Sequence, residues 1–409
     1  MMNSKMTRIL NGLFTLALAA MLASCVSDDT DLADVIAQYQ VEPVDIELDF
    51  SDLAEAGDVV VADENDPAYN DYVENSSWSK VIEIAYDEGG ATVTGTVAGV
   101  AVETRGAHVK VTNLSGPVKF VVRGKTSDGS LKFYGDKRFQ VYLDGADITN
   151  PQGAAINNQG SKSFYVVLAD GSTNTLRDGS NYAMVADEDQ KAALFSEGQM
   201  IFSGKGTLNV YAVGRGGIRS DDYIRIRPGV KLYVNSSALD GLRANDGIMV
   251  DGGVVNIEAT GAGAKGVRSG GVMTVNGGRM IAISAGDTRI GLDDEGVVDT
   301  TACAALYCDS LITVKAGTLK FKATGDGGKG VNSKGNLLVQ GGTLMAVATG
   351  TNVIKKAKGV KLDADLQISG GYFYAYSKRS DPLEVAGKTS VAAGYVTCEM
   401  LPKVVTIAY

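Results

Sequence analysis

The chain has 409 residues, with 48 acidic and 38 basic side chains, a net charge of −10, one histidine and four cysteines. Its basic residues are scattered rather than clustered with aromatic residues, which argues against nucleic-acid binding. One histidine without a nucleophile motif leaves Ser/His/Asp and Cys/His hydrolysis without support, and the lack of a CxxC pair or a Cys/His cluster argues against a zinc site.

The first 25 residues have the pattern of a secretion signal. Lys5 and Arg8 precede a short apolar run at residues 10–22, which is too brief to span a bilayer. The run ends in LASC, which resembles a bacterial lipobox with Cys25 as the lipidated residue, and the acidic residues that follow resemble the surface-export signal of Bacteroides-type lipoproteins. We therefore expect an outer-membrane lipoprotein, exposed at the cell surface and attached to the membrane only through its lipid.

The net negative charge of the chain comes from residues 26–79. Residues 26–75 hold 16 acidic and no basic side chains, whereas residues 76–409 hold 36 basic and 32 acidic ones. High net charge with few apolar runs is typical of an extended, solvated segment. We predict an acidic tether that holds the folded body away from the membrane, or a plain linker without a partner.

From about residue 192 to residue 376 the chain repeats a strand–turn–strand unit. Gly217, Gly241, Gly266 and Gly291 begin successive units at intervals of 24 or 25 residues. A fixed period in the twenties is the mark of a solenoid, and apolar residues that alternate within each unit indicate strands with one buried face. We predict an all-β fold, a single-stranded parallel β-helix over residues 80–409, right-handed as parallel crossovers usually are.

Stacked repeats should align chemically similar residues in columns about 4.8 Å apart. Glycine pairs fall at one register, at residues 252–253, 277–278, 341–342 and 370–371, and we expect sharp corners there because glycine tolerates positive φ. One predicted inward column consists of aliphatic and aromatic residues: Phe202, Ile226, Val250, Val275, Val314, Val339 and Ile368.

Two segments before the coils carry a family resemblance. VYLDGADITNPQGAAINNQGSKSFYVVLADGSTNTLRDGSNY at 141–182 and ALFSEGQMIFSGKGTLNV at 193–210, followed by the GG coils, resemble a family of bacterial carbohydrate-binding β-helix proteins over residues 80–400. The resemblance implies a fold close to pectate lyases, calcium binding, and affinity for cellulose and pectin-type polymers. Coils of that family often read Asp-Gly-Ile-Lys at the corner. Here only Asp240-Gly241-Leu242-Arg243 keeps the acid, so the resemblance implies fewer calcium sites.

Acidic residues in two places are candidate calcium ligands. Asp222 and Asp246 fall in one register on adjacent coils, with Asp221 and Asp240 nearby, and carboxylates about 5 Å apart repel unless a cation lies between them. Asp293 and Asp294 form a second cluster at the corner before an insertion. The alternatives are ion pairs with neighbouring arginines at the first place and a solvated acidic loop at the second.

Arg219, Arg243 and Arg268 occupy one outward register on three consecutive coils. Guanidinium groups pair bidentately with carboxylates, so this ladder suits a uronic-acid polymer. The alternative is that the charges only keep a flat sheet from associating. In this alignment Asp293 and Asn332 interrupt the ladder and Lys361 continues it.

Tyr372, Tyr374 and Tyr376 alternate with inward residues and should point out of one strand. A row of exposed rings would stack on sugars. We favour the alternative, in which a C-terminal cap at residues 380–409 covers the row.

Cys303 and Cys308 lie five positions apart in the insertion between Gly291 and Gly330. In an exported protein they are candidates for a disulfide that closes a small loop. Cys398 is left over, and we expect a buried thiol.

The leading functional hypothesis is a monomer that binds polysaccharide at the cell surface without catalysis. Several weak, regularly spaced contacts would supply the affinity, with uronic-acid polymers as the candidate ligand and calcium as the candidate cofactor. A structural or adhesive surface protein is the first alternative. The second is a calcium-dependent polysaccharide lyase that uses Arg243 beside Asp246.

Overall fold

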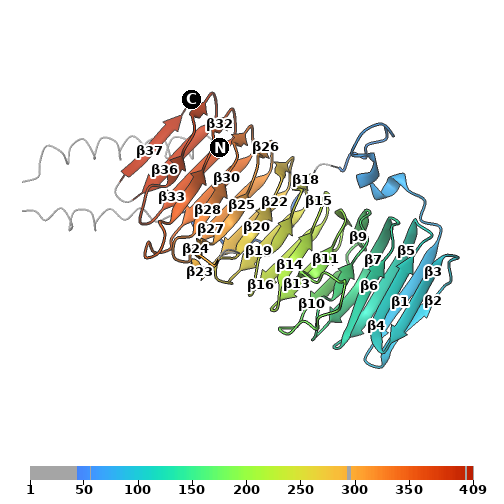
Figure 1. Ribbon diagram of the computed structural model, residues 1–409. Helices are drawn as coiled ribbons and strands as arrows, with labels where there is room; N and C mark the ends of the chain where they lie inside the picture. Colours follow the sequence, from blue (N-terminus) through green and yellow to red (C-terminus); the bar gives the residue numbers. More distant parts are fainter. Residues whose placement is uncertain (1–43, 56, 293–295, 401–402, 409) are drawn as a thin grey trace, which may run out of the picture. The chain divides into compact units, whose positions relative to one another are not determined.

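The computed structural model describes residues 44–55, 57–292, 296–400 and 403–408. These residues form a parallel β-solenoid of about 12 turns and contain no α-helix, which confirms the predicted fold class (Figure 1). Among their helical segments none is long and apolar enough to cross a membrane.

Several predictions from the sequence fall outside the described residues. They concern the signal segment at residues 1–25 with its lipidated Cys25, the first part of the tether, and the acidic pair Asp293 and Asp294.

Most turns of the solenoid contribute one strand to each of three faces, which we call A, B and C. Face A consists of β1 (Val81–Asp87), β5 (Val118–Thr126), the first part of β7 (Phe139–Thr149), β9 (Phe164–Leu168), β12 (Met200–Gly204), β15 (Tyr223–Ile226), β18 (Gly247–Val250), β21 (Val272–Val275), β26 (Ile312–Val314), β29 (Leu337–Val339), β32 (Leu366–Ile368) and β35 (Thr389–Val391). Face B consists of the second part of β7, β10 (Thr173–Arg177), β13 (Thr207–Ala212), β16 (Lys231–Ser236), β19 (Val254–Ala259), β22 (Arg279–Ser284), β27 (Thr318–Ala323), β30 (Thr343–Ala348), β33 (Tyr372–Ser377) and β36 (Tyr395–Met400).

Face C is the separate 12-stranded sheet. It consists of β3 (Val100–Arg105), β4 (Ala107–Asn113), β6 (Gly129–Tyr134), β8 (Ile156–Asn158), β11 (Ala192–Ser196), β14 (Gly216–Ser220), β17 (Leu242–Ala244), β20 (Lys265–Ser269), β25 (Ala304–Cys308), β28 (Lys329–Ser333), β31 (Lys358–Leu362) and β34 (Leu383–Val385). The remaining elements are β2 (Gly90–Thr94), the hairpin β23 (Arg289–Leu292) and β24 (Val298–Thr301), β37 (Lys403–Ala408), and the 3-10 turns η1 (Tyr69–Asp71) and η2 (Val73–Asn75).

The predicted inward column is confirmed along its whole length. Phe202 pairs with Ile226, and the same register continues through each of the other five predicted residues to Ile368. All seven side chains are buried in one continuous core. Because each coil buries its apolar face against the next, the fold depends on stacking rather than on a central globule.

The predicted glycine corners are also confirmed. Gly253, Gly278, Gly342 and Gly371, the second member of each pair, all have positive φ. At Gly278 φ is 81°, and a Cβ atom would lie 2.6 Å from the backbone of Gly252. Stacked corners therefore require glycine both for conformation and for space.

The insertion lies in a different place from the one predicted. Residues from Gly291 do not begin a coil, because β23 and β24 pair with each other as an antiparallel hairpin. The next coil resumes at β25, which pairs with β20 and β28. The motif GLDDEG imitates a coil start, but its strand carries no inward apolar column.

Residues 44–79 do not form an extended spacer. This segment, which we call the strap, lies against the outer sides of faces A and B. Ile46 is fully buried against Ile281 and Val347, and Trp78 packs on Tyr165. The acids of the strap neutralise cations that point outward from the solenoid, in the pairs Asp45–Lys322, Asp49–Arg279, Asp52–Lys231, Asp58–Arg227, Glu74–Arg227 and Asp71–Arg225.

The C-terminal segment extends the solenoid instead of folding over it. Strands β34, β35 and β36 pair in parallel with β31, β32 and β33. Residues 383–400 therefore add one more coil, and the predicted cap over the tyrosine row is wrong.

Candidate functional site

The arginine ladder on face C has the predicted register. Arg219 on β14 lies beside Arg243 on β17, which lies beside Arg268 on β20. Adjacent strands are about 4.8 Å apart, so the three guanidinium groups form a row along the solenoid axis. All three side chains are partly exposed.

The next residue in the ladder is Tyr307 on β25, not Asp293. Tyr307 pairs with Arg268 on one side and with Asn332 on the other, and Lys361 continues the column as predicted. The Tyr307 ring centroid is 5.4 Å from the Arg268 guanidinium carbon. Sequence reasoning missed this residue because the false coil start at Gly291 shifted the alignment, although the segment ALYCDS has the coil pattern.

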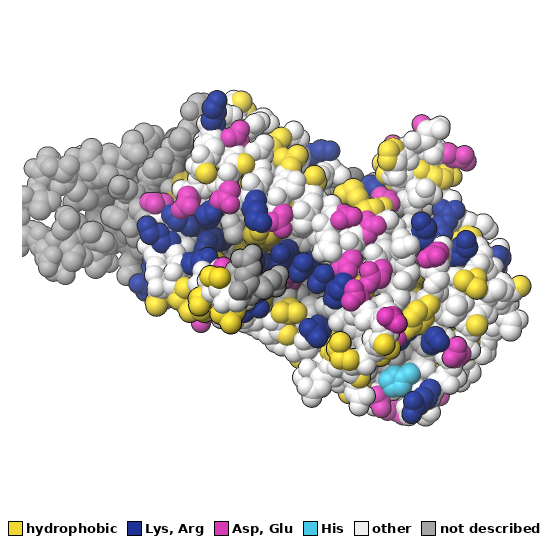
Figure 2. All heavy atoms as spheres, viewed as in Figure 1, with side chains coloured by type: hydrophobic (Ala, Val, Ile, Leu, Met, Phe, Trp, Pro, Cys, Tyr) yellow, Lys and Arg dark blue, Asp and Glu magenta, His cyan; other side chains and the backbone are white. Residues whose placement is uncertain are grey.

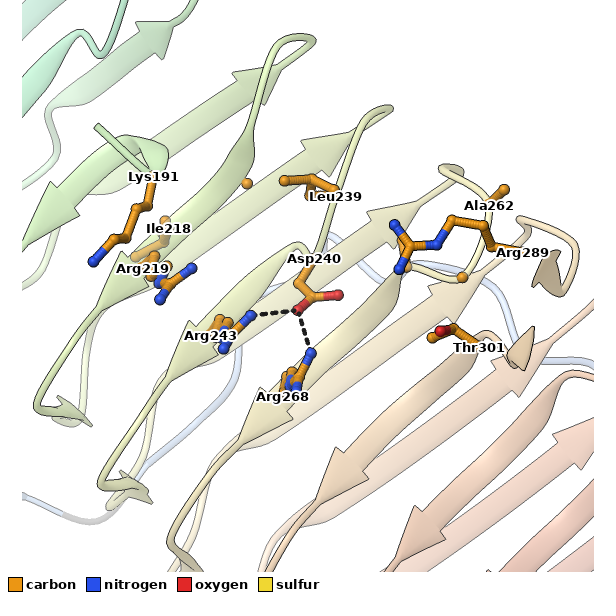
Figure 3. Close-up of a pocket in the computed structure, with 13 residues that line it drawn as sticks. Lys191, Ile218, Arg219, Leu239, Asp240, Arg243, Ala262, Arg268, Arg289 and Thr301 are labelled. Atoms are coloured by element: carbon orange, nitrogen blue, oxygen red, sulfur yellow. Dashed lines mark ion pairs between the residues drawn. The ribbon is translucent and has the colours of Figure 1, made fainter. Parts of the chain in front are cut away.

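Two hollows flank the hairpin β23–β24 beside the ladder, and both include Arg268 and Thr301. The arginine hollow, of about 200 Å³, is lined chiefly by polar and charged residues: Lys191, Arg219, Asp240, Arg243, Arg268, Arg289 and Thr301 (Figure 3). The lysine hollow, of about 310 Å³, is lined chiefly by Lys265, Arg268, Asp299, Tyr307, Lys329, Lys355 and Lys361. Figure 2 shows lysine and arginine side chains gathered in a band across this side of the molecule.

The ladder has fewer anionic partners than cations. Asp240 serves two guanidinium groups, at 3.9 Å from Arg243 and 3.7 Å from Arg268, and its other oxygen accepts the backbone N–H of Lys265 at 2.8 Å (Figure 3). Burial, and then the neighbouring guanidiniums of Arg268 and Arg219, lower the pKa of Arg243. Neighbouring positive charges make the charged form of Arg243 less favourable, and a bound anion would offset this effect. The row can therefore accept carboxylates.

The calcium candidates are only partly brought together. Asp222 and Asp246 lie side by side in register at the corner after face C, where burial and then the charge of Asp246 raise the pKa of Asp222. The carboxylate of Asp222 already accepts the backbone N–H of Tyr223 at 2.8 Å. Asp240 lies at the opposite end of β17 and pairs with arginines instead, so it does not join them.

Another acidic cluster contains Asp221, which the sequence placed near the candidate calcium site, and two acids that were not predicted. Carboxylate oxygens of Asp189, Glu197 and Asp221 all lie within 4.8 Å of one another. The ammonium group of Lys191 pairs with both Asp189 and Asp221, and Arg219 pairs with Asp221 at 2.9 Å. These acids could hold a cation, but Lys191 and Arg219 already pair with two of them. They come from two different coils, so no sequence spacing signals them.

Two members of the predicted tyrosine row are covered, and the third, Tyr372, is partly buried beside them. Tyr374 and Tyr376 point out of face B, as predicted, but only 1% of each residue is exposed. The prediction of a cover is correct, but the strap forms it. Ile46 packs on both rings, and the Tyr374 hydroxyl accepts the N–H of Val44 at 3.3 Å.

The predicted disulfide is absent. Cys303 and Cys308 are free, buried thiols at opposite ends of β25, and five steps along a strand span about 16 Å, far beyond disulfide reach. Burial raises the pKa of Cys308 to about 11. Cys398 is half-buried and packs on the core, and burial raises its pKa to about 11.

Comparison with known proteins identifies the family. A family model described as "Carbohydrate-binding domain-containing protein" matches residues 105–401. The chain belongs to this family. A relative of the same description from Acetivibrio thermocellus is 31% identical over 137 residues, which is 32% of this chain and 46% of the relative, so the chain matches about half of that relative's length.

A solved structure shares the fold. It is described as the polysaccharide lyase-like protein from C. thermocellum, gadolinium derivative. It has 22% sequence identity and a TM-score of 0.50, covering 63% of this chain and 96% of that chain. At this identity the likeness concerns the fold alone.

Proposed function

We propose that this chain binds an acidic polysaccharide along face C without cleaving it. The observation that carries the proposal is the row of Arg219, Arg243 and Arg268, which repeats one guanidinium per coil beside an open hollow. A polymer with carboxylates at regular intervals would meet several of these groups at once, so that individually weak contacts add up. Family membership supports carbohydrate as the ligand class.

Removal of the row tests the proposal. In the variant Arg219→Gln/Arg243→Gln/Arg268→Gln we expect affinity for polygalacturonate to fall by at least about 100-fold, because each charge-assisted contact is worth roughly 1.5 kcal/mol or more. The matched control replaces three exposed arginines away from the row, Arg105→Gln/Arg123→Gln/Arg379→Gln, and should bind almost as well as the parent chain. Equal losses in both variants would show that the row is not the site.

Catalysis is tested in the same samples. A lyase would generate unsaturated uronides that absorb in the ultraviolet, and a hydrolase would generate new reducing ends. Arg243 pairs with Asp240 rather than facing the acids at Asp222 and Asp246, which favours binding over a lyase reaction. Retention without turnover supports the proposal, whereas turnover contradicts its non-catalytic part.

Calcium and the membrane anchor belong to the proposal as well. We propose that calcium, if it assists binding, is held near Asp222 and Asp246, and calorimetric titration should then lose its heat in Asp222→Asn/Asp246→Asn. We also propose that Cys25 carries the lipid of a surface-exposed outer-membrane lipoprotein. Palmitate labelling that persists in Cys25→Ser would contradict the anchor.

A further inference from the structure

Two lysines in the lysine hollow are buried without a carboxylate partner among the described residues. Lys265 is 4% and Lys329 is 5% exposed. Their ammonium groups donate to backbone carbonyls, Lys265 to Ala302 at 2.7 Å and Lys329 to Gly327 at 2.6 Å. Taking an ammonium ion out of water costs several kcal/mol unless an opposite charge compensates it.

The next lysine of the same column shows how this chain pairs a buried ammonium group elsewhere. Lys265, Ala304, Lys329 and Lys358 occupy one register on successive strands of face C. Lys358 is 3% exposed, but it forms ion pairs with Glu384 at 2.9 Å and with Asp381 at 3.3 Å. Lys265 and Lys329 are buried to a similar extent, and no acidic side chain among the described residues forms such a pair with either of them.

Positively charged side chains surround both lysines of the hollow. Burial lowers the pKa of Lys265 to about 8, where Arg268 and Arg289 oppose its charge and Asp240 favours it. Burial also lowers the pKa of Lys329 to about 8, where Lys355 and Lys361 oppose its charge and Glu384 favours it. The Cys303 thiol faces both lysines, and burial raises its pKa.

Small side chains and the hairpin leave room for a ligand group. Ala304 stands between the two lysines, which are two strands, or about 10 Å, apart along the column. Lys355 is held toward β24 by the Thr300 carbonyl at 2.7 Å. Among the lining residues that the structure describes, the one acid is Asp299, which is exposed.

We propose that the lysine hollow is an anion subsite, in which Lys265 and Lys329 receive one carboxylate or sulfate-ester group of the polysaccharide. This inference rests on the proposed function and names where a charged substituent of the polymer enters the protein. Arg268 lines both hollows, so a chain that follows the arginine row leads directly to the subsite. The half-buried Tyr307 ring lies at the same place and offers a surface for the sugar itself.

Proton uptake is the first test and needs no variant. An anion favours the charged form of both lysines, so binding should take up protons near pH 8 and should weaken as the pH rises above 8. Calorimetry of the full chain with a uronate oligosaccharide and with a sulfated, uronate-free oligosaccharide, in buffers of different ionisation enthalpy, measures this uptake for each source of the anion. Uptake with one or both ligands supports the subsite, and binding without uptake contradicts it.

The second test is substitution. Lys329→Gln should weaken binding of the preferred oligosaccharide by roughly 10- to 100-fold and should lower the proton uptake by about half, because Lys265 still titrates. Lys358→Gln, which alters the paired lysine of the same column, should leave both unchanged. Thermal unfolding of each variant checks that it folds, and Lys265→Gln replaces Lys329→Gln if the latter does not.

The outcomes separate the subsite from the function. If the parent chain binds polysaccharide but Lys329→Gln binds equally well, the subsite is wrong and the proposed function stands. If no polysaccharide binds, but inorganic sulfate or monomeric galacturonate stabilises the parent chain and not Lys329→Gln, the subsite stands without the function. If neither polymer nor small anion acts, both are wrong.

Discussion

A buried ion pair joins the strap to the solenoid, and its removal should loosen the strap. The Asp71 side chain is 5% exposed and accepts hydrogen bonds from the Arg225 guanidinium at 2.9 Å and from the Tyr223 hydroxyl. In Asp71→Asn the Arg225 charge stays buried. Breaking such a pair costs about 3–5 kcal/mol, and we expect the lower value of about 3 kcal/mol because Asp251 still contacts Arg225 at 2.6 Å.

Two measurements check this value. Urea unfolding gives the loss of stability, and hydrogen exchange of strap peptides shows whether residues 44–79 open before the coils. Glu64→Gln, an exposed acid of the same strap, is the control and should change neither. If Asp71→Asn is as stable as the control, or if its coils exchange faster while the strap does not, the strap is not held by this pair.

Three further predictions concern the corners, the thiols and acid. Gly278→Ala should destabilise the solenoid by more than about 1 kcal/mol in urea unfolding, because its φ of 81° and the close backbone of the previous coil exclude a side chain. Cys303 and Cys308 should both react with a thiol reagent only after unfolding, and a disulfide found by mass spectrometry in the native chain would contradict the fold of β25. Lys322 and Lys231 lower the pKa of Asp45 and Asp52, respectively, below 3.8, so these pairs stabilise the strap above that pH and are lost as the pH falls below it. The protection of strap amides, meaning how much more slowly they exchange than those of an unfolded peptide at the same pH, should therefore fall below about pH 3.8. Unchanged protection there would contradict these contacts.

The coils could be predicted from sequence because their information is local. A residue such as Val250 lies two positions after another apolar residue and two before a glycine, and the same pattern recurs 25 positions later at Val275. Stacking then turns equal sequence positions into spatial neighbours, so the inward column and the arginine ladder followed directly.

The strap could not be predicted in the same way. Considered alone, its acids indicate a solvated segment, because their partners Arg225, Arg227 and Arg279 lie far away in the sequence. Only the fold brings these cations to the outer surface of neighbouring coils, where they need counter-charges. Alternation of apolar and acidic residues in VDIELDF at 44–50 was the available signal, because every second residue of an extended segment faces the same side.

The candidate site was found in part for a related reason. Arg219, Arg243 and Arg268 repeat with the coil period, but Tyr307 follows an insertion that breaks it. Lys265 and Lys329 are buried at the first position of β20 and β28, and the sequence does not show whether a carboxylate lies opposite. Burial and the absence of an ion pair are properties of three dimensions, and they separate these lysines from Lys358.

A structure of the chain with a bound acidic oligosaccharide tests the central claim most directly. We predict that the sugar lies along face C, with its charged groups within hydrogen-bond distance of Arg219, Arg243 and Arg268 and its chain passing beside the hairpin β23–β24. A ligand bound over face A or face B, with the arginine row free, would contradict the account.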